Sequence, residues 1–294
     1  MKRQNQNETQ LPTSHRSAFT LVEILTVIAI ISILVALVSP AILNALGSAE
    51  EAAVAVELTQ LDQALTAFNA KFDRYPPSSI TLYGDKAGWD GDPVAKSAIR
   101  SIWRDFDFST GGRVASGVPQ SDPSLPDFHP WGTDMITLTG DECLVFFLSG
   151  VPDSNGTLTG FSVDSRRPFQ VGGSRIDPFF TGWKDRETRL IDTDGDGIFA
   201  YTDGLSDTDA TIFYSAATRG RYASSQPAYF QADGTTPWNP DTFQLIAPGE
   251  DGNLGTITEA AAGAKVIWSE GITLGNTRQT ERDNITNFAG GTLE

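Results

Sequence analysis

The chain has 294 residues, with 37 acidic and 21 basic side chains, a formal net charge of −16 and an isoelectric point near 4.4. Such a surface repels nucleic acid and anionic headgroups and favours divalent cations, so no nucleic-acid partner is expected. Its 17 Phe, 6 Tyr and 6 Trp can supply a sizeable core. The single cysteine, Cys143, excludes an intrachain disulfide.

An apolar run follows the hydrophilic residues 1–18. Residues 19–38 read FTLVEILTVIAIISILVALV, and Glu23 is the one charge among these 20 residues. A helix of this length spans about 30 Å, the thickness of a membrane's hydrocarbon core. Lys2, Arg3 and Arg16 precede the run, which predicts a cytoplasmic N-terminus and a C-terminal part on the outer side of the membrane.

Glu23 indicates more than a simple anchor. A carboxylate deep in a membrane span costs about 2.5 kcal/mol or more when it has no partner. Residues 19–38 contain no Lys, Arg or His. We therefore expect its partner to come from another chain, or from an amine generated at Phe19 by proteolysis.

The sequence SAFTLVE at residues 17–23 resembles the prepilin peptidase site of type IV prepilins and type II secretion pseudopilins, although Ala18 stands where Gly is usual. The resemblance implies cleavage between Ala18 and Phe19, methylation of the new Phe19 amine, and pairing of Glu23 with a neighbouring subunit during assembly. It implies as partners the prepilin peptidase, other pilin or pseudopilin subunits, an inner-membrane assembly platform and membrane lipid. The expected localisation is the inner membrane, with a single pass, and then a filament.

A second apolar pattern continues this helix beyond the membrane. Apolar residues recur at steps of three and four, typical of one helix face: Val54, Leu58, Leu61, Leu65, Phe68 and Phe72. Pro76 and Pro77 end the pattern, because neither can donate a backbone N–H. The prediction is a leader at 1–18, a transmembrane half at 19–38, an amphipathic half at 39–75 bent near Pro40, and a globular domain at 76–294.

The globular part shows short strands and long polar loops. Strands are predicted at 210–215, 243–247 and 264–268, and Thr139 with Glu142 forms a capping box before a short helix that ends at Gly150. Residues 78–135 show no clear elements. One long helix followed by short strands predicts an α+β fold, with the helix packed on a small antiparallel sheet.

An acidic segment predicts a calcium site. Asp192, Asp194, Asp196 and Asp203 stand at positions 1, 3, 5 and 12 of a loop with Gly197 at position 6. This is the spacing of an EF-hand loop, except for Asp in place of Glu at position 12. The backbone carbonyl of Ile198 would complete the ligands. A solvated acidic turn is the alternative.

A weaker resemblance concerns the C-terminal third. Residues 243–252, with 283–285 further on, resemble the end of major pseudopilins, where a strand leads into a calcium-binding loop. The resemblance implies a second calcium site with Glu250, Asp251 and Asp283.

The sequence does not indicate an enzyme. His129 is the one histidine outside the leader, and no nucleophile elbow or phosphate-binding loop occurs. Two functions remain: a structural subunit of a type II secretion pseudopilus or type IV-like pilus, or a minor pilin-like adhesin or substrate-recognition module with the same anchor. The large globular domain favours a specialised role, whereas Glu23 favours ordinary incorporation.

Overall fold

The computed structural model describes residues 20–109, 135–151, 157–170, 172–185, 187–195, 197–206, 208–222, 228–259 and 265–293. The chain divides into two compact units, one ending at Ala49 and the other running from Glu50 to Glu294. We call the first the anchor segment and the second the head. The element order, one long helix followed by short helices and short strands, is the α+β class that the sequence predicts.

The helix α1 (Leu21–Phe72) is 52 residues long and continues through Pro40. It ends where Asp73 adopts a left-handed conformation, with φ 57°, and donates its N–H to the carbonyl of Asn69 at 2.7 Å. The two prolines that follow cannot continue the hydrogen-bond pattern. The helix thus ends at Phe72, three residues before the predicted limit at residue 75.

One face of α1 is buried in the head. Phe68 sits at the centre of an aromatic cluster, with its ring 6.0 Å from Phe147 and 5.2 Å from Phe179. Each fully buried side chain of this size stabilises the fold by about 1.5–3 kcal/mol. The helix is therefore held in the head mainly by apolar contacts. The residues of α1 that are at most 2% exposed are Val54, Leu58, Leu61, Leu65 and Phe68.

Two short helices lie where the sequence predicts no element. Asp85 caps α2 (Lys86–Gly91) through the N–H of Gly88. Asp92 caps α3 (Pro93–Ile102), which begins with a proline. The missing N–H of Pro93 does not weaken the helix, because N–H groups in the first turn have no partner within the helix. The pair Asp92-Pro93 is the signal in the sequence from which the start of α3 could have been predicted. A strand pair, β1 (Ile80–Tyr83) with β2 (Met135–Leu138), precedes and follows these helices in the chain.

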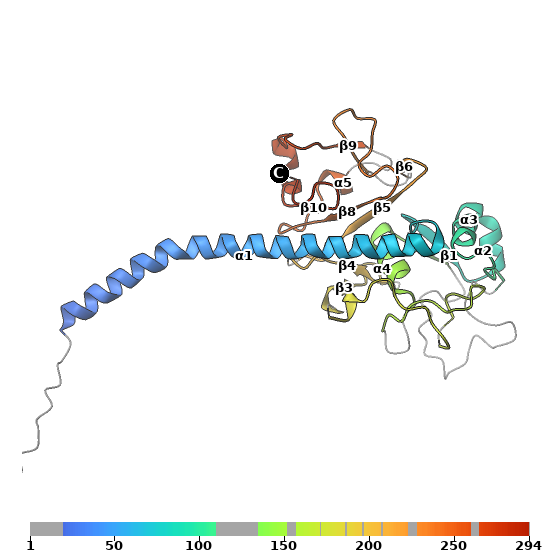
Figure 1. Ribbon diagram of the computed structural model, residues 1–294, viewed down its shortest axis with the longest axis horizontal. Coiled ribbons are helices and arrows are strands. Elements are labelled where there is room, and N and C mark those ends of the chain that lie inside the picture. Colours follow the sequence, from blue (N-terminus) through green and yellow to red (C-terminus); the bar gives the residue numbers. More distant parts are fainter. Residues whose placement is uncertain are drawn as a thin grey trace, which may run out of the picture. The chain divides into compact units, whose positions relative to one another are not determined.

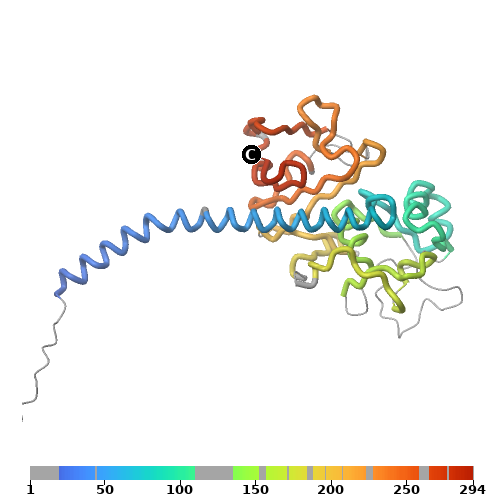
Figure 2. Tube along the Cα trace, in the orientation of Figure 1, coloured from blue at the N-terminus to red at the C-terminus, as the bar shows by residue number. Residues whose placement is uncertain are grey.

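The largest sheet has four antiparallel strands in the order β10-β8-β5-β6. In Figures 1 and 2 the C-terminal residues 228–259 and 265–293, coloured orange to red, lie on one side of the head's part of α1, and β3, β4 and α4 lie on the other. The strands of the sheet are β5 (Phe213–Thr218), β6 (Arg221–Tyr222), β8 (Phe243–Ala247) and β10 (Ile285–Thr286). The remaining strands are β3 (Leu190–Ile191) with β4 (Ala200–Tyr201), which pair antiparallel, and β7 (Ala228–Phe230) with β9 (Lys265–Ile267), which pair parallel.

The predicted short helix is present as α4 (Gly140–Ser149). Its capping box joins Thr139 and Glu142, and Gly150 ends it with φ 78°. Cys143 on this helix is completely buried, and burial raises the pKa of its thiol, so it is chemically inert. The other helical turns are η1 (Gly182–Asp185), η2 (Glu187–Arg189), α5 (Thr256–Glu259) and η3 (Asn276–Glu281).

Two of the three strand predictions hold. Strand β8 covers residues 243–247 and β9 covers 265–267, within the predicted segments. The prediction at 210–215 is wrong by three residues, because β5 begins at Phe213. Thr211 instead forms an isolated bridge with Thr202, and the N–H of Ile212 donates to the carbonyl of Tyr201 at 2.8 Å. Those residues follow the β3–β4 hairpin before the chain enters the sheet.

The C-terminal residues build a second, smaller core around Tyr229 and Trp268. Glu281 is buried among them and accepts hydrogen bonds from Arg278 and from the hydroxyl of Tyr229. Burial acts to raise the pKa of Glu281, but the hydrogen bonds from Arg278, Thr256 and Tyr229 lower it below its ordinary value. The carboxylate is thus held ionised and joins β7 to η3.

Two buried tryptophans differ in the partner of their indole N–H, which yields a stability prediction. Trp268 donates to the carbonyl of Leu293 at 3.0 Å, whereas Trp183 has no partner among the described residues. Trp268→Phe should therefore destabilise the head by about 2 kcal/mol more than Trp183→Phe, because only the first leaves a buried acceptor unpaired. Thermal unfolding of the full chain in detergent micelles measures both. Equal losses of stability in the two variants would contradict the assigned hydrogen bond from Trp268 to Leu293.

Candidate functional site

The first turn of α1 has a reciprocal hydrogen-bond pattern. Glu23 Oε2 accepts from the backbone N–H and from the hydroxyl of Thr20, each at 2.8 Å, and Thr20 Oγ1 accepts from the N–H of Glu23 at 3.2 Å. This is a capping box. Glu23 was not predicted to have a partner in its own helix, although the Thr20-x-x-Glu23 spacing is the signal for one. Ala18 and Phe19 lie outside the described residues.

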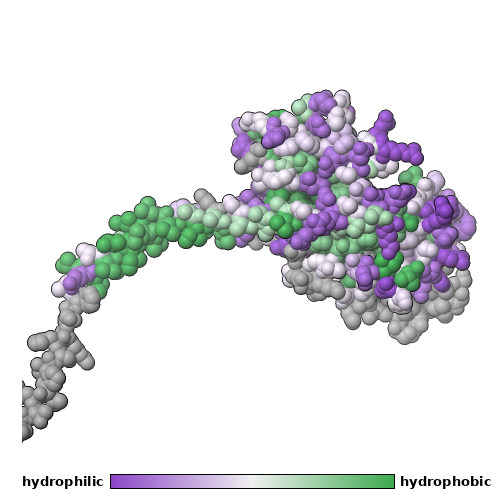
Figure 3. Space-filling view, in the orientation of Figure 1, coloured by the Kyte–Doolittle hydropathy of each residue, from purple (hydrophilic) through white to green (hydrophobic). Residues whose placement is uncertain are grey.

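The anchor segment exposes its apolar side chains. From Leu21 to Leu46, the large hydrophobic side chains are between 49% and 80% exposed. They form the continuous hydrophobic surface of α1 in Figure 3. Helix α1 is the one helix in the described ranges that is long and apolar enough to cross a membrane, with a mean hydropathy of 3.0 in its best window. Exposed apolar area costs roughly 25 cal/mol per Å² in water, so lipid or other protein must cover this surface.

The acidic segment forms the loop of the β3–β4 hairpin. Asp192 directly follows β3, and its two oxygens accept hydrogen bonds from the N–H groups of Gly195 at 2.8 Å and Gly197 at 3.1 Å. Gly195 and Gly197 have φ of 82° and 87°, which glycine adopts without steric cost. Both glycines therefore turn the chain sharply at this loop. Asp194 is exposed, and Asp196 lies outside the described residues.

Asp203 sits at the base of the hairpin and is only 1% exposed. Its oxygens accept hydrogen bonds from the N–H groups of Leu205 at 3.0 Å and Gly249 at 2.9 Å. Burial raises the pKa of this carboxyl above its ordinary value, although the two N–H groups favour ionisation. Ile198 packs in the core, 3% exposed. In the part of the chain that the structure describes, no three His, Cys, Asp or Glu side chains are close enough to hold a metal ion.

The acidic segment near the C-terminus and the acidic hairpin contact the same turn, at residues 249–251. Asp283 Oδ2 accepts from the N–H of Asp251 at 2.9 Å, two residues from the glycine that Asp203 contacts. Burial raises the pKa of Asp251, and the nearby Asp283 adds to the effect. Glu250 is exposed. Carboxylates from both predicted calcium segments therefore hold the turn at residues 249–251, a contact that sequence reasoning did not anticipate.

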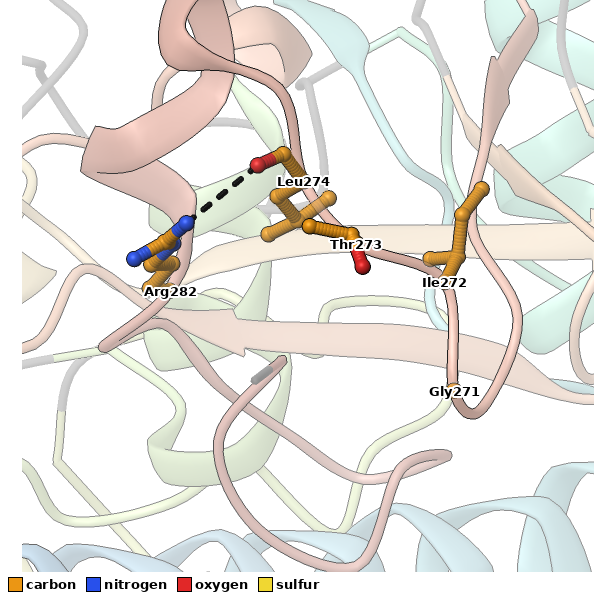
Figure 4. Close-up of a pocket in the computed structure, with 5 residues that line it drawn as sticks. All are labelled: Gly271, Ile272, Thr273, Leu274 and Arg282. Atoms are coloured by element: carbon orange, nitrogen blue, oxygen red, sulfur yellow. Dashed lines mark hydrogen bonds between the residues drawn. The ribbon is translucent and has the colours of Figure 1, made fainter.

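A cavity of about 300 Å³ lies in the C-terminal part of the head. It is lined by Gly271, Ile272, Thr273, Leu274 and Arg282 (Figure 4). Arg282 donates to the carbonyl of Leu274 at 3.3 Å, the interaction drawn as a dashed line. Among these lining residues, one exposed guanidinium and one hydroxyl are the polar side chains, and the two form no catalytic arrangement.

The similarity of the chain to known proteins is found at its N-terminus. Residues 13–39 match the family model described as the prokaryotic N-terminal methylation motif. No curated protein and no solved structure matches the chain. The matched residues include Ala18, Phe19 and Glu23. The chain therefore carries a type IV prepilin-like N-terminus.

Motif and fold together define the class of protein. A long apolar N-terminal helix followed by a mixed α/β domain with antiparallel sheets is a pilin-like architecture. The chain is thus a prepilin-like protein. Its motif implies processing by prepilin peptidase, anchoring in the inner membrane before assembly, and assembly with pilin subunits. Pilin-like proteins are generally structural rather than enzymatic.

Proposed function

We propose that the protein is a structural subunit of a type II secretion pseudopilus or a type IV-like pilus. The observation that carries the proposal is the prepilin-like motif at the start of a helix whose hydrophobic side chains are exposed from Leu21 to Leu46. In the membrane, lipid covers this surface, with the N-terminus cytoplasmic and the head outside. In the filament, the same surface packs against other subunits.

The exposed face of α1 in the head supports assembly through the helix. From residue 52 to residue 67 the exposed positions of α1 carry no charge, although the chain as a whole has a net charge of −16. Small and uncharged residues allow two helices to approach closely. This face therefore suits contact with a second copy. Its residues are Ala52, Ala53, Val56, Thr59, Gln60, Gln63, Thr66 and Ala67.

Placing a charge on this face tests the proposal. Val56→Asp should reduce filament yield about tenfold or more, because burying an unpaired carboxylate between subunits costs more than the ~1.4 kcal/mol that corresponds to tenfold. Val163→Asp is the matched control, since Val163 has the same 58% exposure as Val56 but does not belong to α1. Sheared-filament yield, normalised to chain in the membrane, is the measurement. Equal yields from the two variants would contradict the proposal.

The head itself favours the second candidate, a minor pilin-like adhesin or substrate-recognition module. Its C-terminal residues build a core separate from the one that packs on α1. Such an addition suits a recognition surface more than a repeated building block. Quantitative mass spectrometry of purified filaments distinguishes the two functions, because a structural subunit is the dominant component and a recognition subunit is present in few copies.

We also infer that the acidic hairpin binds calcium through Asp192, Asp194 and Asp196, with Ile198 and Asp203 as the remaining predicted ligands. The glycine turn of the loop and the acidic spacing of the segment support this proposal. Glu250, Asp251 and Asp283 are the proposed second site, and the turn shared with Asp203 supports it.

Chelation tests the hairpin site. Extracellular calcium modules bind at about 10⁻⁴–10⁻³ M, and ligand at about 100 times Kd stabilises the folded state by about 2.7 kcal/mol. The full chain in detergent micelles should then melt about 5–10 °C higher in excess calcium than in chelator. Asp194→Ala should remove most of the difference, whereas Asp105→Ala, an exposed aspartate far from the hairpin in the sequence, should leave it. Identical melting temperatures in calcium and chelator would leave the loop a solvated turn.

A further inference from the structure

Polar contacts hold α1 in the head from two sides. Glu57 is 3% exposed and accepts hydrogen bonds from Arg189 Nη1 at 3.0 Å and from the hydroxyl of Tyr201. Five residues later, Asp62 Oδ2 accepts from Asn287 Nδ2 at 3.3 Å. Arg189 and Tyr201 belong to the β3–β4 hairpin region and Asn287 follows β10, and these segments lie on opposite sides of α1 in Figure 1.

The two carboxylates mark the borders of the buried helix face. A helix turns about 100° per residue, so Glu57 and Asp62 lie about 140° apart around the axis, with Leu58, Leu61 and Leu65 between them. Apolar burial is non-directional, whereas hydrogen bonds have preferred angles. The leucines hold the helix in the head, and the polar contacts at the borders resist its rotation about its own axis.

Packing alone leaves room for such a rotation on the Glu57 side. A cavity of about 290 Å³ adjoins the helix there, lined by Glu50, Ala53, Glu57 and Arg189 among others. Gly204 keeps space for the Arg189 side chain, because a Cβ at this position would lie 2.6 Å from Arg189 Nε. The ion pair of Glu57 with Arg189 thus lies beside a cavity that apolar side chains do not fill.

We propose that Glu57, with Arg189 and Tyr201, sets the rotational register of α1 in the head and so decides which helix face is offered to a second copy. Glu57 is then a positioning residue for the assembly proposed above, on which this inference rests. Buried ion pairs often stabilise a fold no more than apolar replacements do, but they can specify one arrangement. In the observed register the uncharged face with Ala53, Val56 and Gln60 is outward.

Thiol labelling of the full chain in detergent micelles tests the register. Ala53→Cys and Ala64→Cys probe the same border of the helix, where Ala53 is exposed and Ala64 is 5% exposed. With Glu57 present, only the first should react. In a Glu57→Met/Tyr201→Phe background, one of the two labelling rates should change about tenfold or more, which corresponds to ~1.4 kcal/mol. Rotation toward the cavity slows the reaction at position 53, and rotation away from it accelerates the reaction at position 64.

The native Cys143 serves as the internal control, because it is completely buried and stays unlabelled while the head is folded. Unchanged labelling at both probes, with Cys143 protected, would overturn the inference, since the apolar core would then set the register alone. If Cys143 reacts in the double variant, Arg189→Met is tested by the same criteria, because it removes only a partner whose side chain is 34% exposed.

Filament yield in the same backgrounds separates this inference from the proposed function. A changed register should lower the yield although the melting temperature stays within a few degrees. A changed register with full yield would overturn the positioning role. A chain that forms no filaments with Glu57 intact would refute the proposed assembly function, while the labelling rates would still decide whether Glu57 sets the register.

Discussion

Glu23→Gln should leave the chain inserted in the membrane with a folded head, yet reduce filament yield about tenfold or more. Insertion should not suffer, because removing a carboxylate from a membrane span removes a cost of about 2.5 kcal/mol. Gln at this position retains the capping box with Thr20, since its side-chain oxygen can still accept both hydrogen bonds. The variant therefore loses only the charge that would pair with the amine of a neighbouring subunit.

Thr20→Val is the matched control. It removes the hydroxyl that bonds to Glu23 but leaves the carboxylate in place. If the charge serves assembly, Thr20→Val should keep most of the filament yield that Glu23→Gln loses. If the helix cap is the role of Glu23, the order reverses, and the assembly assignment is wrong. The yield of sheared filaments, normalised to membrane-inserted chain, decides between the two.

The long helix was predictable because its signal is local and repeated. Steps of three and four residues from Val54 to Phe72 indicate one buried face, and each of these positions except the half-buried Phe72 is nearly inaccessible in the head. Pro76 and Pro77 predicted the end only to within three residues, because α1 already ends at Phe72 rather than at residue 75. The capping box of Thr139 and Glu142 was predictable for the same reason, since both partners lie within one turn.

The short elements were less predictable, because tertiary contacts decide their limits. The segment from Ala210 to Ser215 has strand composition throughout, but the backbone of Ile212 bonds to Tyr201 before the sheet begins at Phe213. The pairing of β7 with β9 joins residues about 37 positions apart and runs parallel. Neither composition nor periodicity fixes a partner at that distance.

The candidate sites divide in the same way. The prepilin-like motif is a contiguous string, and it is the part of the chain that matches a known family model. The contact of Asp203 with Gly249 spans 46 positions and that of Glu57 with Arg189 spans 132. Such contacts depend on the completed fold, so the sequence could name these acidic residues but could not show which of them meet.

Processing tests the central claim most directly, through the intact mass of the chain after co-expression with a prepilin peptidase. We expect a product that lacks the 18 residues before Phe19 and carries a methyl group on its new amine. The loss of Lys2, Arg3, Arg16 and Glu8 removes a net charge of +2, so the formal side-chain charge changes from −16 to −18.

Ala18→Leu should block the cleavage, because the site resembles those in which a small residue precedes the cut, and the same chain without peptidase should keep its full mass. A single product that begins at methylated Phe19 is the result this account predicts. An uncut leader in the presence of the peptidase, or a cut after the apolar run at residues 19–38, would contradict it.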